Sequence, residues 1–439
     1  MPAAAVAQRD SAAVVRATLR GWEDDVRLAI FDRSGSFHGR FSDRGILQRF
    51  NDRLDPEYTI DQISFGFSLV EDYAWYGNRN GARWWAGSIN HRFMVQRAEV
   101  GGGVALGETW RFNALLSQEA TMQTDRALVR ATVANTFGHG QVVAFATGFL
   151  NADKPEMDVE LGASLRPGGG TLTVAVAALD LFSDIVYGVL EVPPVDADRA
   201  LDYVQNPYTL RLAADLPLGR HGRMEAYGLY MLPTRLTATG QVDTVSSFAQ
   251  DERYAYAGGL FEWTPTIKTA LGVTATWVGA DLDRSSLDES PSSDDFVLAE
   301  RNTHVGLYAI QRLRARWLFE SRVVREWRTE TRTRPDTTIA EAIDYADRAW
   351  LGRATMTYQA NSGFRGELGL DFALRDVVRD EDMPGSSQRG KHTRLRFDVG
   401  WYFGRTAMFV AGTNADLDRD SGGATGWFDG GHARFQVFW

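Results

Sequence analysis

The stretch KHTRLRFDVGWYF, residues 391–403, alternates apolar and polar side chains almost without error. The apolar positions are Leu395, Phe397, Val399, Trp401 and Phe403, and the charged positions between them are Arg394, Arg396 and Asp398. A period of two is that of a β-strand whose two faces meet different surroundings. The stretch therefore predicts a strand with one apolar face and one charged face.

The same alternation returns along most of the chain, for example in residues 364–375, 315–328, 156–166 and 109–117. These segments run for about 9–14 residues, whereas an ordinary strand has about 5–6 and a strand that crosses a membrane needs about 9–11. Trp and Phe cluster near the ends of the apolar faces, as they do in the aromatic girdles of membrane barrels. No apolar run reaches the roughly 18–20 residues of a transmembrane helix.

The links between these segments alternate between short and long. The pattern predicts about eighteen strands, near 63–70, 88–97, 109–117, 126–137, 141–150, 155–166, 171–182, 208–218, 222–231, 252–263, 267–280, 303–311, 315–328, 349–359, 364–376, 391–403, 406–415 and 431–439. The long links are 183–207, 232–251, 281–302, 329–348, 377–390 and 416–430. Tight turns at one rim and long loops at the other are typical of outer-membrane barrels.

The end of the chain supports this interpretation. It reads Ala-Arg-Phe-Gln-Val-Phe-Trp over residues 433–439, so Phe435, Val437 and Trp439 fall at alternate positions. This resembles the last strand of bacterial outer-membrane β-barrel proteins of the porin-like group, although a final Phe is commoner there than Trp. In that family the terminal aromatic residue belongs to the signal read by the barrel assembly machinery.

The resemblance implies an all-β fold, a transmembrane antiparallel β-barrel of about 16–18 strands in the outer membrane. It further implies that both termini are periplasmic and that the long links lie outside the cell.

Three regions are expected along the chain. Residues 1–8 read as the remnant of a signal peptide or as a disordered start. Residues 9–60 do not alternate; their apolar residues are spaced like one face of a helix, and the segment is either periplasmic or inserted in the lumen, unless early strands are hidden in it. Residues 61–439 form the barrel.

Composition excludes several classes of function. The formal net charge of −10 argues against nucleic-acid binding, and the absence of cysteine excludes disulfides and thiol chemistry. The seven histidines are scattered without metal spacing, and no Gly-rich phosphate loop is present. We therefore expect no enzyme and no cofactor.

Charged side chains on the inward faces are the candidate functional residues. The predicted pore-lining set is Arg111, Arg316, Glu320, Arg322, Arg365, Glu367, Asp371, Arg394, Arg396 and Asp398. One interpretation is a mutually neutralising network that stiffens the wall. The other is a pore lining in which the arginines at 316, 322, 365, 394 and 396 attract anions.

The long links are acidic and suggest a cation site. Asp416, Asp418 and Asp420 have the spacing of the first ligands of a calcium loop. Ser421 and Trp427, however, stand where that loop requires Gly and Glu. An acidic surface that bridges lipopolysaccharide through divalent ions, or that simply aids solubility, is the alternative.

The sequence thus predicts an outer-membrane channel for passive diffusion of small polar, in particular anionic, solutes. The alternative is a plugged or narrow barrel that anchors an envelope or surface protein complex. The expected partners are outer-membrane lipid, lipopolysaccharide and the barrel assembly machinery. A homo-oligomer stays open, because trimers are common in the porin group and no stretch marks a subunit interface.

Overall fold

The computed structural model describes residues 81–89, 93–121, 125–137, 140–151, 157–167, 170–181, 199–240, 247–287, 295–333, 343–379, 387–403, 407–417 and 428–438. These residues form nineteen strands: β1 (Gly81–Ile89), β2 (Phe93–Leu106), β3 (Trp110–Thr121), β4 (Asp125–Phe137), β5 (Gly140–Asn151), β6 (Met157–Pro167), β7 (Thr171–Leu181), β8 (Arg199–Gln205), β9 (Tyr208–Leu218), β10 (Gly222–Gly240), β11 (Phe248–Thr266), β12 (Thr269–Ser286), β13 (Phe296–Arg314), β14 (Trp317–Thr333), β15 (Ile343–Gln359), β16 (Phe364–Arg379), β17 (Ser387–Phe403), β18 (Ala407–Asp416) and β19 (Phe428–Phe438). Within this part of the chain, no helix has the length and apolar character needed to cross a membrane.

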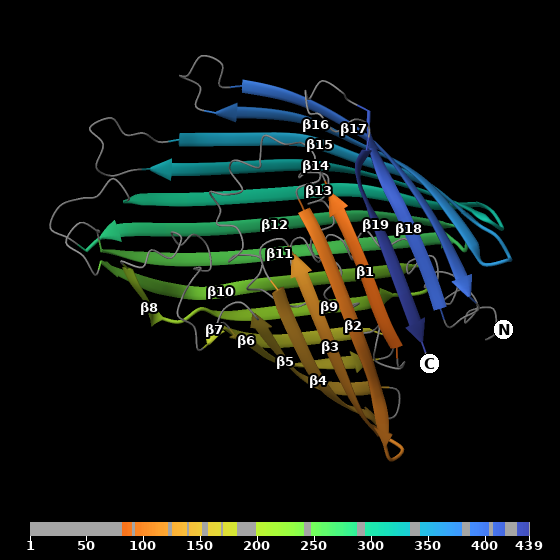
Figure 1. Cartoon of the computed structure of the whole chain (residues 1–439), viewed down its shortest axis with the longest axis horizontal. Coiled ribbons are helices and arrows are strands. Elements are labelled where there is room, and N and C mark those ends of the chain that lie inside the picture. The colour runs from red at the N-terminus through yellow and green to blue at the C-terminus, as the bar shows by residue number, and fades with distance from the viewer. Residues whose placement is uncertain are drawn as a thin grey trace.

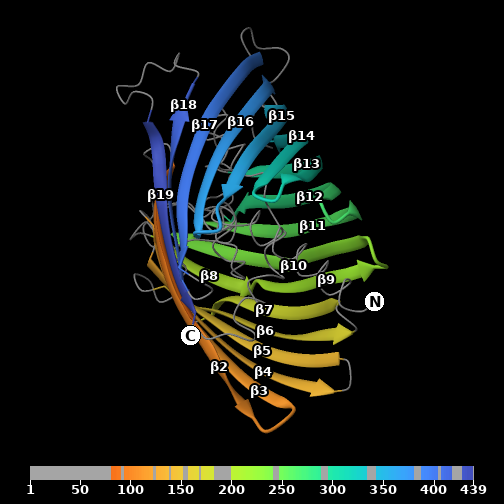
Figure 2. The ribbon, with the colours of Figure 1, turned by 90° about the vertical axis from the view of Figure 1, so that its right-hand side faces the viewer.

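All strands except β8 form one closed antiparallel ring (Figures 1 and 2). Each strand pairs with its neighbour in sequence, β7 pairs with β9, and β1 closes the ring by pairing with both β2 and β19. Closure leaves no unpaired edge, which a sheet surrounded by lipid could not tolerate. The eighteen-stranded ring confirms the predicted fold class.

The short strand β8 continues the line of β9. β8 pairs with the C-terminal part of β10, where Arg199 lies opposite Gly240. β9 pairs with the N-terminal part of β10, where Leu218 lies opposite Gly222. Pro207 separates β8 from β9, and Pro233 lies at the register shift in β10. Proline lacks the N–H that a ladder needs, so the two prolines interrupt a strand that would otherwise run from β8 into β9.

The barrel wall is taller on one side than on the other. Strands β10–β17 have 16–19 residues each, whereas β1–β7 have 9–14. The long strands cross Figure 1 from side to side, and the shorter β1–β5 lie across them. The predicted lengths of about 9–14 residues are therefore too short for β10–β17.

Sixteen of the predicted strands overlap one strand of the ring each. The prediction 88–97 is wrong, because this range straddles the end of β1 and the start of β2. The adjacent Trp84 and Trp85 break the alternation in β1, and three glycines at 101–103 hide it in β2. The prediction 63–70 lies outside the described residues.

Two predicted turns and five predicted long links also need correction. The turns expected at 264–266 and 311–314 lie at Ile267–Lys268 and Ala315–Arg316 instead. The acidic link expected over 281–302 is shorter, because β12 continues to Ser286 and β13 begins at Phe296. The links expected over 232–251, 329–348 and 377–390 are shorter for the same reason, because the strands on both sides extend into them. The link expected over 183–207 contains the strand β8.

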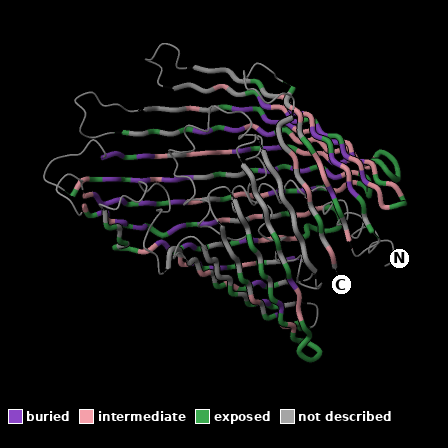
Figure 3. The backbone as a smooth tube through the Cα atoms, in the orientation of Figure 1, coloured by how far each residue is buried: buried purple, intermediate pink, exposed green. Residues whose placement is uncertain are grey.

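Burial alternates along the strands (Figure 3). On β16 the outward Leu368 and Leu370 are 51% and 41% exposed, whereas the inward Glu367 and Asp371 are 7% and 1% exposed. This distribution is the reverse of that in a water-soluble protein, where charged residues are almost never fully buried. The buried side chains lie inside the ring, and exposed apolar side chains form its outer surface.

Candidate functional site: the charged inner wall

The inward faces of β14–β17 carry a row of charged residues. The strand register aligns Arg322, Arg353, Asp371 and Arg394 across the four strands. The Arg353 guanidinium donates from Nε to Asp371 Oδ1 at 2.5 Å and from Nη2 to Asp371 Oδ2 at 2.8 Å. This two-bonded pair holds both groups in the geometry that guanidinium and carboxylate prefer.

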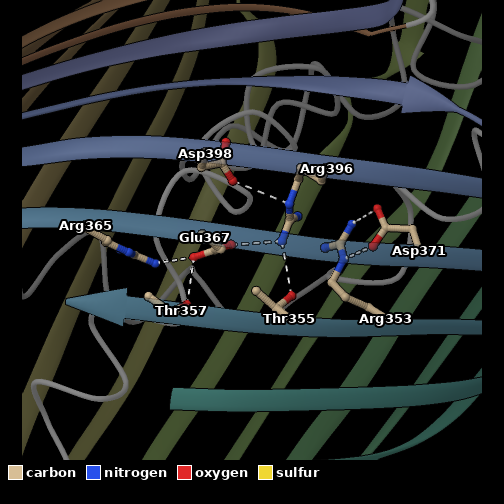
Figure 4. A network of polar contacts seen from close by, with 8 residues as sticks. All are labelled: Arg353, Thr355, Thr357, Arg365, Glu367, Asp371, Arg396 and Asp398. Atoms are coloured by element: carbon tan, nitrogen blue, oxygen red, sulfur yellow. Dashed lines mark hydrogen bonds and ion pairs between the residues drawn. The ribbon is translucent and has the colours of Figure 1, made fainter. Parts of the chain in front are cut away.

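Glu367 is the centre of a second cluster, four residues along β16 from Asp371 toward the short-turn rim (Figure 4). Its Oε2 accepts hydrogen bonds from Arg365 Nη2 at 2.5 Å and from Thr357 Oγ1 at 3.1 Å. Its Oε1 accepts one from Arg396 Nη2 at 3.0 Å, and Arg396 Nε lies 3.5 Å from Asp398 Oδ2. Two arginines and two carboxylates thus share one buried network.

Gly369 leaves the space through which Arg396 reaches this network. Arg396 lies opposite Gly369, and its Nη2 reaches across that glycine to Thr355 Oγ1 on β15, at 3.3 Å. A Cβ at Gly369 would stand 3.2 Å from both Nε and Nη2 of Arg396. The missing side chain therefore lets a guanidinium from β17 contact β15, two strands away.

The same arrangement occurs on β11–β13. Tyr308 lies opposite Gly272, and its hydroxyl donates to Glu262 Oε2 on β11 at 2.7 Å. The ring occupies the space that a Cβ at Gly272 would need. Polar contacts that skip a strand therefore recur around the inner wall, and each depends on a glycine.

Arg284 anchors the inner wall near the long-link rim. Its guanidinium carbon lies 4.5 Å from the ring centroid of Phe248 and 4.8 Å from that of Phe296. Its Nε and Nη2 donate to Gln250 Oε1 at 2.8 and 2.6 Å, and Gln250 in turn donates to Glu252. The two aromatic faces stabilise this cation.

Eight of the ten predicted pore-lining residues come together on β14–β17, and two do not. Arg316 lies exposed in the turn between β13 and β14, because β14 begins at Trp317. Arg111 lies on β3, where its Nε donates to Asn113 Oδ1 at 2.8 Å. Arg365 and Arg396 are both paired with Glu367, and the choice between a neutralising network and a pore lining stays open.

Sequence reasoning misses several members of these networks. Thr355 and Thr357 carry no charge, and Gln250 and Arg284 fall in ranges predicted as loops. His304 lies opposite Glu326, with its Nε2 3.0 Å from Glu326 Oε1. Only the strand register, which the sequence alone does not provide, brings such partners together.

The outer surface of the ring has two aromatic belts. On β14, Trp317 and Trp327 both face outward and each is 42% exposed. Ten residues separate them, which is about 33 Å along a strand and about 25 Å across a membrane at the tilt usual for barrels. Trp263, Trp401 and Phe403 lie at the Trp317 end, and Trp277 and Trp350 at the Trp327 end.

The spacing of the belts matches the apolar band of an outer-membrane barrel, about 25 Å tall and flanked by aromatic residues. The chain folds as a transmembrane antiparallel β-barrel. Its outward Leu, Val and Phe side chains face lipid, and its inward charged side chains are shielded from it.

The chain was compared with family models, curated proteins and solved structures. No family model matches the chain, and no curated protein matches it. OccAB3 of Acinetobacter baumannii has a TM-score of 0.42 at 10% identity, covering 82% of this chain and 98% of that one. A loop L8 deletion mutant of OmpT, an outer membrane protein of Vibrio cholerae, has a TM-score of 0.41 at 10% identity, covering 82% and 97%. OccK10 (OpdN) of Pseudomonas aeruginosa has a TM-score of 0.36 at 12% identity, covering 82% and 97%.

Several predictions lie outside the described residues of the barrel. Residues 1–8 and 9–60 are among them, as are Trp439, Asp418 and Asp420. Asp416 is the last residue of β18. Within the described residues, no group of three or more His, Asp or Glu could hold a metal ion. The calcium loop therefore stays a prediction.

Proposed function

We propose that the barrel is a porin-like outer-membrane channel through which small polar solutes diffuse passively. The closed eighteen-stranded ring with charged side chains on its inner wall carries this proposal. Barrels of about 16–18 strands have a lumen wide enough for an aqueous channel. A wall of fixed charges lowers the free energy of a polar solute that leaves bulk water.

Anions are the favoured solutes. The inward side chains described on β14–β17 include six arginines and five carboxylates, although the whole chain carries a net charge of −10. The six are Arg322, Arg328, Arg353, Arg365, Arg394 and Arg396, and the five are Glu320, Glu326, Glu367, Asp371 and Asp398. The small positive excess favours a weak preference for anions.

Conductance in a planar bilayer tests the proposal. We expect stable single-channel openings from the folded protein, and a reversal potential in a potassium chloride gradient that indicates anion preference. Folded, heat-modifiable protein that inserts but stays silent would contradict an open channel. Release of labelled fatty acid or peptide by the purified protein would contradict a passive role.

One observation favours the second candidate, a plugged barrel that serves as an anchor. Met231, Leu236 and Leu298 lie on inward faces, and each is 0% exposed. A side chain that lines a water-filled lumen is wetted, so this part of the wall favours a filled lumen. The N-terminal segment 9–60 is the candidate occupant.

Deletion of residues 9–60 separates the two candidates. Openings that appear only after the deletion would make the segment a plug in a channel-forming barrel. Silence both before and after the deletion, from folded protein, would favour the anchor. Equal conductance before and after the deletion would support the open channel and contradict a plug formed by residues 9–60.

We also propose that the last strand carries the assembly signal. Phe435 and Val437 lie on the outward face of β19, two residues apart, and Phe435 is exposed. Deletion of Trp439 should slow the appearance of folded barrel in cells, measured as the heat-modifiable band. An unchanged rate would contradict this role.

A further inference from the structure

Two arginines and two tryptophans form a checkerboard on the lipid-facing side of β14 and β15. Arg325 lies opposite Trp350, and Trp327 lies opposite Arg348, two residues further along both strands. Side chains two residues apart on a strand share one face, so all four residues face outward together. Each arginine is therefore flanked by tryptophans along its strand and across the pair.

Arg325 is held by its aromatic neighbours. Its guanidinium carbon lies 5.6 Å from the ring centroid of Trp327 and 5.1 Å from that of Trp350. Among the described residues, neither Arg325 nor Arg348 forms an ion pair with a carboxylate. Asp376 is the register partner of Arg348 on β16, yet no ion pair joins the two. The hydrogen-bonding edges of both guanidinium groups are thus left for an external acceptor.

The checkerboard lies at the boundary between lipid and water. Trp327 belongs to the aromatic belt at the long-link rim. Arg325 lies two residues from it on the same outward face of β14, closer to the middle of the membrane. Val305, Val323 and Leu374 surround Arg325 on the outward face and are 41–48% exposed. An arginine on a lipid-facing wall is costly unless an anion neutralises it, and a lipid headgroup is the anion present at this depth.

We infer that Arg325 and Arg348 bind the phosphate groups of lipid A in the outer leaflet. Diagonal positions on neighbouring strands are about 7–8 Å apart, so two guanidinium groups can engage a headgroup that carries two phosphates. The apolar residues below them receive the acyl chains. We expect lipid A at this site in place of a phospholipid, because the long-link rim faces the outside of the cell. This orientation rests on the proposed function.

Binding of defined lipids to the delipidated full-length barrel tests the inference. Native mass spectrometry would count bound bisphosphorylated lipid A, monophosphorylated lipid A and phosphatidylglycerol. We expect the double variant Arg325→Gln/Arg348→Gln to bind bisphosphorylated lipid A about tenfold more weakly or worse, because charge-assisted hydrogen bonds to phosphate are lost. Monophosphorylated lipid A should bind the unmodified barrel more weakly than the bisphosphorylated form.

Controls keep the test specific. Arg253→Gln removes an exposed, outward-facing arginine of β11 outside the checkerboard and should leave lipid A binding unchanged. The variant Arg325→Lys/Arg348→Lys keeps the charge and should retain part of the affinity. If the double glutamine variant does not fold, Arg348→Gln alone tests the exposed half of the site.

Two outcomes would overturn the inference: unchanged lipid A binding in the folded glutamine variant, or equal binding of phosphatidylglycerol by the unmodified barrel. Conductance measured on the same samples separates this result from the proposed function. A silent barrel that still loses lipid A in the glutamine variant would contradict the channel and support the lipid site.

Discussion

The Arg353–Asp371 ion pair makes the inner wall sensitive to a single charge. Asp371 is 1% exposed and Arg353 is 11% exposed. We expect Asp371→Asn to lower the free energy of unfolding by about 3 kcal/mol, because it leaves a buried guanidinium without its carboxylate. Denaturant unfolding in lipid vesicles would measure this loss.

The matched control is the outward pair Arg235–Asp251, whose side chains are 50% and 55% exposed. Asp251→Asn should cost less than about 1 kcal/mol, because water screens an exposed pair. Equal losses at both sites would mean that the inner wall is wetted as thoroughly as the outer rim.

Gly369 provides a second test at the residue scale. In Gly369→Val the new side chain would stand where the Arg396 guanidinium crosses β16, so we expect a loss of about 1–3 kcal/mol from overpacking. The same substitution at the outward Gly366, whose Cβ would meet only the Phe364 ring at 3.4 Å, should be tolerated. If both variants unfold alike, Arg396 has another route to Glu367.

Among the elements, the long strands rise beyond the lipid. On β14, Thr329 and Thr331 face outward beyond the Trp327 belt and are exposed, whereas Val323 lies between the belts. We expect Val323→Arg to cost about 2–4 kcal/mol, because it places a charge on the lipid face, and Thr331→Arg to cost less than about 1 kcal/mol. Vesicle unfolding distinguishes these values, and equal costs would contradict the position of the membrane.

The same strands mark the limit of what the sequence predicts. β16 and β17 are predictable because lipid on one side and the lumen on the other impose opposite polarity on alternate residues. Beyond the belt the polarity of β12 is reversed: outward Asp281 and Asp283 are charged, whereas inward Leu282 is apolar and buried. Because the outward charges resemble a solvent-exposed link, the extensions of β12 and β13 read as loops. In β1 the paired tryptophans hide the strand in a similar way.

For the candidate site, alternation predicts which charged residues face inward but not how they pair. Arg365, Glu367 and Asp398 face inward as their strand parity predicts, and a pore-lining role stays a prediction. Their partnership with Arg396 depends on the register between β16 and β17 and on Gly369. Register is set by turn geometry and by the match between the apolar faces of two strands, so the alternation of one strand alone does not give it.

At the scale of the whole molecule, charge and height are distributed unevenly around the ring. The tall half, β10–β17, carries the ion pairs on its inner wall, whereas the inward residues described on β4–β7 are small or uncharged, such as Ala134, Val143, Ser164 and Ala175. Among the described inward side chains, most of the fixed charges therefore lie on the tall half. Substitutions that change ion selectivity are expected on the tall half.

The orientation of the barrel can be tested directly because the chain has no cysteine. Thr331 lies near the long-link end of β14, and Ile267 lies in the short turn between β11 and β12; both are exposed. In intact cells we expect a membrane-impermeant maleimide too large for the lumen to label Thr331→Cys. Ile267→Cys should react only after the outer membrane is permeabilised, because short turns face the periplasm. The opposite labelling pattern would mean that the long links face the periplasm. It would also contradict lipid A binding at Arg325 and Arg348.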